Sequence, residues 1–218
     1  LDMQPIDPPI GGGRLRLLGL YHNLGPMLPT TYVGTYDWPG EPFRRHRLSE
    51  SLEEIDVPLS DAHFAAAASW KERAGGKTII DSAFSHLAHR SGAYVETVRH
   101  AVASAYIVVF SHPWVFPLVK DVLKRRPQLV VYDSHNVEGL LRHTLLGDSE
   151  FGTQLARHAA VIERDLCRCA DLVLASWKMQ NVTRRRRFLS AAAGYVVRHA
   201  LGVNAKTVSS FFRVYRAR

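Results

Sequence analysis

Three short, continuous apolar runs limit what this chain can fold into. They lie at Tyr106–Phe110, Leu129–Tyr132 and Leu172–Ala175, and segments with helical periodicity, Val115–Arg126 and Glu150–Arg168, separate them. Continuous apolar runs of this length, alternating with helices, are typical of parallel strands that helices cover on both faces. We therefore predict an α/β fold with a single Rossmann-like, doubly wound and mostly parallel sheet.

The upstream sequence predicts further helices and one short strand. Apolar spacing favours a helix over Arg14–Leu24, which Gly25-Pro26 would end, and a strand over Thr30–Thr35. Three more helices are expected, over Asp61–Trp70, Thr78–Arg90 and Gly92–Ser104. The carboxylate of Asp61 is expected to cap the first of these three.

Three consecutive glycines, Gly11, Gly12 and Gly13, follow a proline-stiffened turn and precede the first predicted helix. Without Cβ atoms, their N–H groups can approach an anion closely, and the positive end of the helix dipole favours negative charge. The spacing is neither that of a dinucleotide fold nor that of a P-loop. Two interpretations stay open: a phosphate site, or a flexible helix entry.

Polar residues follow two of the predicted strands. Ser111 and His112 come after the first, and Ser134, His135 and Asn136 come after the second. Ligands of open α/β sheets bind beyond the carboxyl ends of the strands, where a histidine can contact a sugar hydroxyl or exchange a proton. For either histidine taken singly, a ring bonded to the backbone at the rim is the favoured interpretation. Asn136 is expected to cap a helix that begins near Glu138.

The basic residues are unevenly distributed. The chain carries a formal net charge of +8, yet residues 178–218 hold ten Lys and Arg and no acidic residue. The other 18 basic and 20 acidic residues leave the body at −2, so no specific nucleic acid is expected as partner. We predict a domain over residues 5–176 and a basic tail of uncertain structure over 177–218, with Arg184–Arg187 on a solvated face or on an anionic surface.

Few features of the sequence indicate the cellular compartment of the protein. Cys167 and Cys169 stand two apart in a helical pattern, which favours free thiols in a reducing cytoplasm. No apolar run reaches the roughly 18 residues of a spanning helix, and residues 1–9 lack the basic start of a signal peptide. A cytoplasmic location is expected, with peripheral contact at the inner membrane surface as an option for the basic tail.

Four segments, taken in order, resemble the N-terminal, acceptor-side half of family 4 retaining glycosyltransferases, which have the GT-B fold. The segments are Pro8–Arg14, Ile107–Trp114, Val131–Glu138 and Glu163–Leu174. The resemblance extends over residues 5–176, about four-fifths of the chain.

The resemblance implies transfer of a hexose from a nucleotide-sugar to a hydroxyl acceptor, saccharide or lipid-linked, with retained configuration and with no metal or other cofactor. Gly11, Gly12 and Gly13 would lie against the donor diphosphate, and His135 would lie beside the transferred sugar as the catalytic candidate. The acceptor and sugar rim would then comprise Ser111, His112, Ser134 and Asn136. N–H groups at a helix start suit the charge that builds on a departing diphosphate.

The chain departs from the family pattern in three ways. Leu1–Ile6 is short and polar for a central first strand, so a stunted strand is expected. The family's second Rossmann-like domain, with its donor-binding residues, has no counterpart in the sequence, so the chain alone should be inactive. Around Ser176 the resemblance and the acidic residues end together, which predicts a poorly packed tail produced by a reading-frame shift or fragment junction. The alternatives are a non-catalytic sugar- or nucleotide-binding module and a binder of anionic surfaces or nucleic acid that acts through the basic tail.

Overall fold

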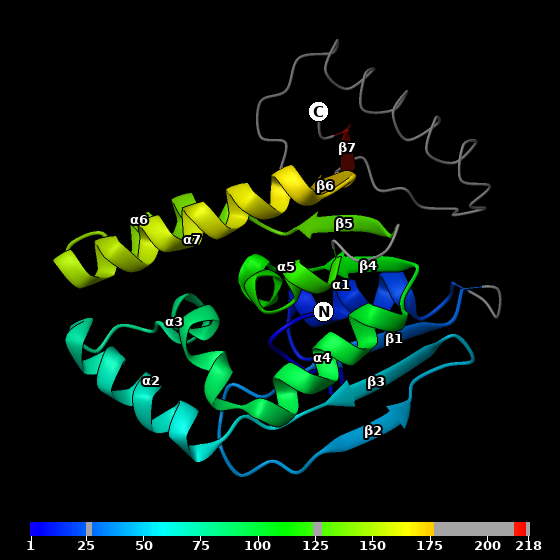
Figure 1. Ribbon diagram of the computed structural model, residues 1–218, viewed down its shortest axis with the longest axis horizontal. Coiled ribbons are helices and arrows are strands. Elements are labelled where there is room, and N and C mark those ends of the chain that lie inside the picture. Colours follow the sequence, from blue (N-terminus) through cyan, green and yellow to red (C-terminus); the bar gives the residue numbers. More distant parts are fainter. Residues whose placement is uncertain (25–27, 124–127, 177–211, 217–218) are drawn as a thin grey trace.

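The strands of the protein form two sheets in the computed structural model, which describes residues 1–24, 28–123, 128–176 and 212–216 (Figure 1). The smaller sheet has the order β1-β3-β2 and the larger one the order β4-β5-β6-β7. Their bounds are β1 Thr30–Gly34, β2 Arg44–Arg47, β3 Leu52–Asp56, β4 Ile107–Phe110, β5 Leu129–Ser134, β6 Leu172–Ser176 and β7 Phe212–Arg216.

The three apolar runs form the parallel strands that the sequence predicts. β4 pairs in parallel with β5, with Ile107 opposite Leu129, and β5 pairs in parallel with β6, with Val131 opposite Leu172. The fold is therefore α/β. β1 and β3 are also parallel, whereas β2 and β7 run antiparallel to their neighbours.

The prediction of one continuous sheet is not confirmed, because the two sheets flank an irregular N-terminal segment. The N–H group of Asp2 donates to the carbonyl of Val33 in β1 at 3.1 Å, and the amino group of Leu1 donates to that of Val109 in β4 at 2.8 Å. The N–H group of Ser111 donates to the carbonyl of Leu1 at 3.3 Å. Pro5 has no N–H group to extend these bonds into a ladder, and residues 1–6 form no strand, where the sequence predicts a stunted one.

The helices follow the predicted periodicity closely. Gly92–Ser104 is helical with the predicted bounds, and the other helices differ from prediction by a few residues at their ends. The bounds are α1 Gly12–Tyr21, α2 Asp61–Arg73, α3 Ile80–Leu87, α4 Gly92–Ser104, α5 Phe116–Leu123, α6 Glu138–Leu146 and α7 Glu150–Cys169, with 3₁₀ turns at Ala88–Arg90 and Pro113–Val115.

Two predicted helix caps are wrong. The residue that caps α2 is Ser60, whose Oγ accepts a hydrogen bond from the N–H group of His63 at 3.2 Å, while Asp61 is the first helical residue. Asn136 does not cap α6, because the residue at the cap position is Val137 and the side-chain amide of Asn136 donates to Glu138 Oε1 at 3.3 Å. A serine oxygen at the extended residue before the helix reaches the free N–H groups better than a residue already inside it.

The main core lies between the larger sheet and the helices beside it. Phe110, Trp114 and Tyr94 are fully buried in it, and β1 and β3 contribute Val33 and Ile55. Cys167 and Cys169 are half-buried and are not joined in a disulfide. None of the helices in the described ranges has both the length and the apolarity that a bilayer-crossing segment needs.

Part of the predicted tail belongs to the larger sheet. The backbone of β7 pairs with β6, with Phe212 opposite Ser176 and Tyr215 opposite Val173. The sequence did not predict this strand. Residues 177–211 and 217–218, among them Arg184–Arg187 and Phe211, lie outside the described residues.

Candidate functional site

His112 lies at the carboxyl end of β4 and is paired with the N-terminal segment. Its Nδ1 atom is 2.9 Å from Asp2 Oδ1, and the Asp2 side chain is 5% exposed. Burial disfavours the imidazolium, but the carboxylates of Asp2, Glu138 and Asp81, of which Asp2 contributes most, together outweigh this effect and raise the pKa of His112 to about 9. His112 in turn holds the pKa of Asp2 below its usual value, against the effect of burial. A cationic ring is thus fixed at this edge of the sheet.

His135 follows β5 and lies against His112, with the ring centroids 4.9 Å apart. Its Nε2 atom is 3.7 Å from Asp133 Oδ2, which is too far for a hydrogen bond. Both atoms are buried, and neither has a hydrogen-bond partner. Buried polar atoms without partners are uncommon in folded proteins, and a bound polar group would satisfy both.

The other Asp133 oxygen is held by the helix that follows the glycines. Arg16 of α1 forms an ion pair with Asp133 Oδ1, and the side chains of the pair are 19% and 1% exposed. Arg16 lies one turn beyond Gly12, so this contact places the first turn of α1 next to the carboxyl end of β5. The glycine loop and the two histidines therefore belong to one edge of the molecule.

The glycine loop has the form that a helix-entry anion site requires. Gly11 is the residue before α1 and has a φ of 86°, a left-handed conformation that side chains rarely adopt. No side chain caps α1, and its first turn holds no acidic residue. A Cβ at Gly11, Gly12 or Gly13 would meet nothing within 4 Å, so the loop faces open space.

The helix after β5 is capped by a buried carboxylate from a distant helix. Glu163 of α7 accepts hydrogen bonds from the N–H groups of Glu138 at 3.0 Å and Gly139 at 2.9 Å, and from the hydroxyl of Tyr132 at 3.0 Å. A carboxylate is favourable at this positive helix end. Glu163 thereby fixes how β5 passes into α6, and with it the position of the intervening His135.

A second charged group lies beside the histidines. Arg142 of α6 bonds Glu138 at 2.9 Å and Asp81 at 2.6 Å, and its guanidinium lies 5.4 Å from the centre of the Trp114 ring. Burial raises the pKa of Asp81, although Arg142 opposes this. The carboxylates near the histidines are thus mostly paired with fixed cations.

The predicted site residues fall into two groups. His112 and His135 are in contact, and Gly11–Gly13 are linked to them through α1. Ser111 is 2% exposed, and the Ser134 hydroxyl donates to the carbonyl of Asn136 at 2.6 Å, so both serine side chains are buried at this end of the strands. Asn136 is exposed beside them.

Sequence reasoning did not single out Asp2, Arg16 and Asp133, although all three determine how the histidines lie. Asp133 is the penultimate residue of β5, and Arg16 stands one turn into the helix after the glycines; both positions are signals that could have been used. Asp2 carried no signal, because only the fold brings it to His112.

Two further features lie on or beside the smaller sheet. A cavity of about 1300 Å³ is lined by the first residues of β1 and β4 and by α4, toward the strand ends opposite the histidines.

His46, Glu54 and Asp56 bring potential metal-ligand atoms within 4.8 Å of one another, and they are the candidate metal ligands among the described residues.

Comparison of the chain with known protein families, with curated protein sequences and with solved structures finds no match.

Proposed function

We propose that this chain is a nucleotide-sugar-binding domain of a retaining glycosyltransferase, corresponding to the acceptor-side half of a GT-B fold. The two sheets would then be one Rossmann-like sheet that is interrupted at its central strand. The bonds from Leu1 to β4 and from Asp2 to β1 support this view, because they place that segment between the two sheets.

The observation that carries the proposal is the unpaired couple formed by His135 Nε2 and Asp133 Oδ2. The two atoms are 3.7 Å apart, buried and without partners. A hydroxyl group can donate one hydrogen bond and accept another, so a sugar hydroxyl between them would satisfy both. His135 would orient the sugar rather than take its proton.

The remainder of the edge suits the donor diphosphate. A Cβ built at Gly11, Gly12 or Gly13 would meet no protein atom within 4 Å, so a ligand can approach the start of α1, and the cationic His112 adds a positive charge at the candidate site. Arg16 is engaged by Asp133 and serves to place α1. The acceptor would be a saccharide or lipid-linked hydroxyl. We expect these 218 residues to bind the donor weakly and to transfer no sugar unaided.

The test is calorimetric titration of the purified chain with UDP, GDP and their hexose conjugates. We expect weak binding that His135→Ala reduces more for the hexose conjugates than for the free diphosphates, because His135 contacts the sugar. The control is His100→Ala, an exposed histidine on α4 that should leave binding unchanged. Equal binding by wild type and His135→Ala would overturn the role of His135. Absence of any nucleotide binding would overturn the proposal, and turnover by the chain alone would contradict the expected inactivity.

A further inference from the structure

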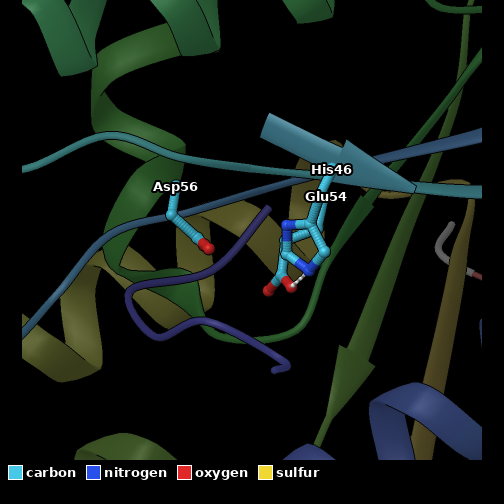
Figure 2. Close-up of side chains that lie close together, drawn as sticks. All are labelled: His46, Glu54 and Asp56. Carbon is cyan, nitrogen blue, oxygen red and sulfur yellow. Dashed lines mark ion pairs between the residues drawn. The ribbon is translucent and has the colours of Figure 1, made fainter. Parts of the chain in front are cut away.

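We propose that His46, Glu54 and Asp56 form a binding site for one divalent transition-metal cation, of which Zn²⁺ is the best match. The site lies on the β2–β3 hairpin of the smaller sheet (Figure 2). It stands on its own geometry and does not depend on the proposed sugar-nucleotide binding.

The alternation of side chains along two paired strands assembles this cluster. His46 of β2 lies opposite Glu54 of β3, and Arg44 lies opposite Asp56. Residues two apart share one face of a strand, and cross-strand partners are neighbours, so these four side chains occupy one face. Glu54 and Asp56 are completely buried, whereas the His46 side chain is 29% exposed. The histidine thus stands where an ion could enter.

The contact between His46 and Glu54 has the spacing of two ligands on one ion. His46 Nε2 is 3.3 Å from Glu54 Oε2 but makes no hydrogen bond, although both ring nitrogens are buried. Two ligands at about 2.0–2.1 Å from a tetrahedral zinc ion are separated by about 3.3 Å. Figure 2 shows the His46 ring and the Glu54 carboxyl group side by side, with the Asp56 side chain turned toward them.

Asp56 gives an independent indication of a missing partner. Its side chain is fully buried; Oδ2 accepts two hydrogen bonds from Arg44, at 2.8 and 3.0 Å, while Oδ1 has no partner. A buried carboxylate oxygen without a partner is costly, and an ion or a donor normally satisfies it.

The local charge is also unbalanced. Asp7 Oδ2 lies 3.7 Å from His46 Nε2, so Asp7, Glu54 and Asp56 form a group of three carboxylates. Arg44 contacts all three of them and supplies one positive charge. Two negative charges remain, which a divalent cation would balance.

The donor set points to the class of metal. One imidazole with two or three carboxylates suits zinc, manganese or iron(II), whereas magnesium and calcium prefer oxygen ligands alone. Glu54 also accepts hydrogen bonds from the N–H groups of Ile6 and Asp7. A metal ion bound to Glu54 would therefore connect Ile6 and Asp7, which precede the glycine loop, with the β2–β3 hairpin.

The experiment is titration of the metal-free full chain with ZnCl₂, MnCl₂ and MgCl₂ by calorimetry, with thermal unfolding measured alongside. We expect one zinc ion per chain, a higher unfolding temperature, weaker manganese binding and the weakest response to magnesium. His46→Ala should lower the zinc affinity at least tenfold. Glu53→Gln is the matched control, because Glu53 pairs with Arg45 on the other face of the same hairpin and should leave zinc binding unchanged.

The alternative is that a protonated His46 itself balances the carboxylates. His46→Cys separates the two cases, because a thiolate binds zinc but cannot carry positive charge, so this variant should retain zinc binding that His46→Ala lacks. If His46→Ala does not fold, X-ray absorption of the zinc complex of the unaltered protein should show one imidazole with oxygen ligands, and Asp56→Asn should weaken binding. Absence of zinc binding, or unchanged binding in His46→Ala, would overturn the site.

Discussion

His112 and Asp2 are paired across 110 residues, with His112 Nδ1 2.9 Å from Asp2 Oδ1. The pair joins the N-terminal segment, which lies between the two sheets, to the loop after β4. It therefore stabilises the junction between the sheets as well as the cation at the candidate site.

This pair makes stability depend on pH. The pKa of His112 rises from 6.5 in the unfolded chain to about 9 in the folded protein, so the folded state holds its proton more tightly. The stabilisation is complete below pH 6.5 and is lost as the pH rises through about 9, at a cost of about 3–4 kcal/mol. Urea unfolding at a series of pH values measures it.

Asp2→Asn is the informative variant for the pH prediction. Without the carboxylate, the fall in unfolding free energy between pH 6.5 and 9 should largely disappear. The lowered pKa of Asp2 acts in the opposite direction: its stabilisation is present above pH 3.8 and is lost as the pH falls through the lowered value. A wild-type profile parallel to that of Asp2→Asn across pH 6.5–9 would contradict the pairing.

Removal of Arg16 should strongly destabilise the fold. Asp133 is 1% exposed, and Arg16→Ala leaves that carboxylate buried without its cation, at an expected cost of about 3–5 kcal/mol. The double variant Arg16→Leu with Asp133→Asn should recover much of the loss, because no unpaired charge remains. Denaturant unfolding of the three proteins decides this. A loss below 1 kcal/mol for Arg16→Ala would show that the pair does not hold α1 to β5.

Gly12→Val should separate ligand binding from folding. A Cβ at Gly12 meets no protein atom within 4 Å, so stability should change by less than about 1 kcal/mol. The branched side chain would nevertheless block the approach of a diphosphate to the helix start, and nucleotide binding should fall at least tenfold. Titration with UDP, with a circular dichroism melt as the folding control, tests both. Retained binding would argue for the flexible-entry interpretation of the glycines.

Glu163→Gln should weaken the start of α6. The neutral amide loses the charge-assisted bonds to the N–H groups of Glu138 and Gly139, and we expect a loss of about 1–3 kcal/mol in unfolding free energy. Asp165→Asn, on the exposed side of the same helix, is the matched control and should be nearly neutral. Equal stability of the two variants would contradict the capping role of Glu163.

Gly139→Ala should show how tightly α6 and α7 pack. An added Cβ would lie 2.6 Å from the Cβ of Ala160, so the helices must separate, at a cost of about 1–3 kcal/mol. Gly92→Ala, at the start of α4 where nothing lies within 4 Å, is the control and should be neutral or slightly stabilising. Thermal unfolding compares them. Equal melting temperatures would mean that this helix contact is loose.

Much of the larger sheet could be predicted from local pattern. The continuous apolar runs at β4, β5 and β6 predict parallel strands that are buried on both faces. The spacing of apolar residues predicts α2, α4 and α7, because a helix that buries one stripe repeats its apolar residues with the helical period. The sequence did not predict β2 and β3, because their residues are largely charged and form no apolar pattern. Arg44 and His46 are strand residues only because Glu54 and Asp56 lie opposite them.

The features of the candidate site also divide into those that the local sequence predicts and those that only the fold brings together. The sequence by itself determined the α/β class, the strand ends that carry His112 and His135, and the glycine entry to α1, since each follows from the residue types in a short window. Only the tertiary structure decided the pairings of Asp2 with His112 and Arg16 with Asp133, and the assembly of His46, Glu54 and Asp56. These contacts depend on sheet register and chain path, which bring together residues that carry no local signal of one another.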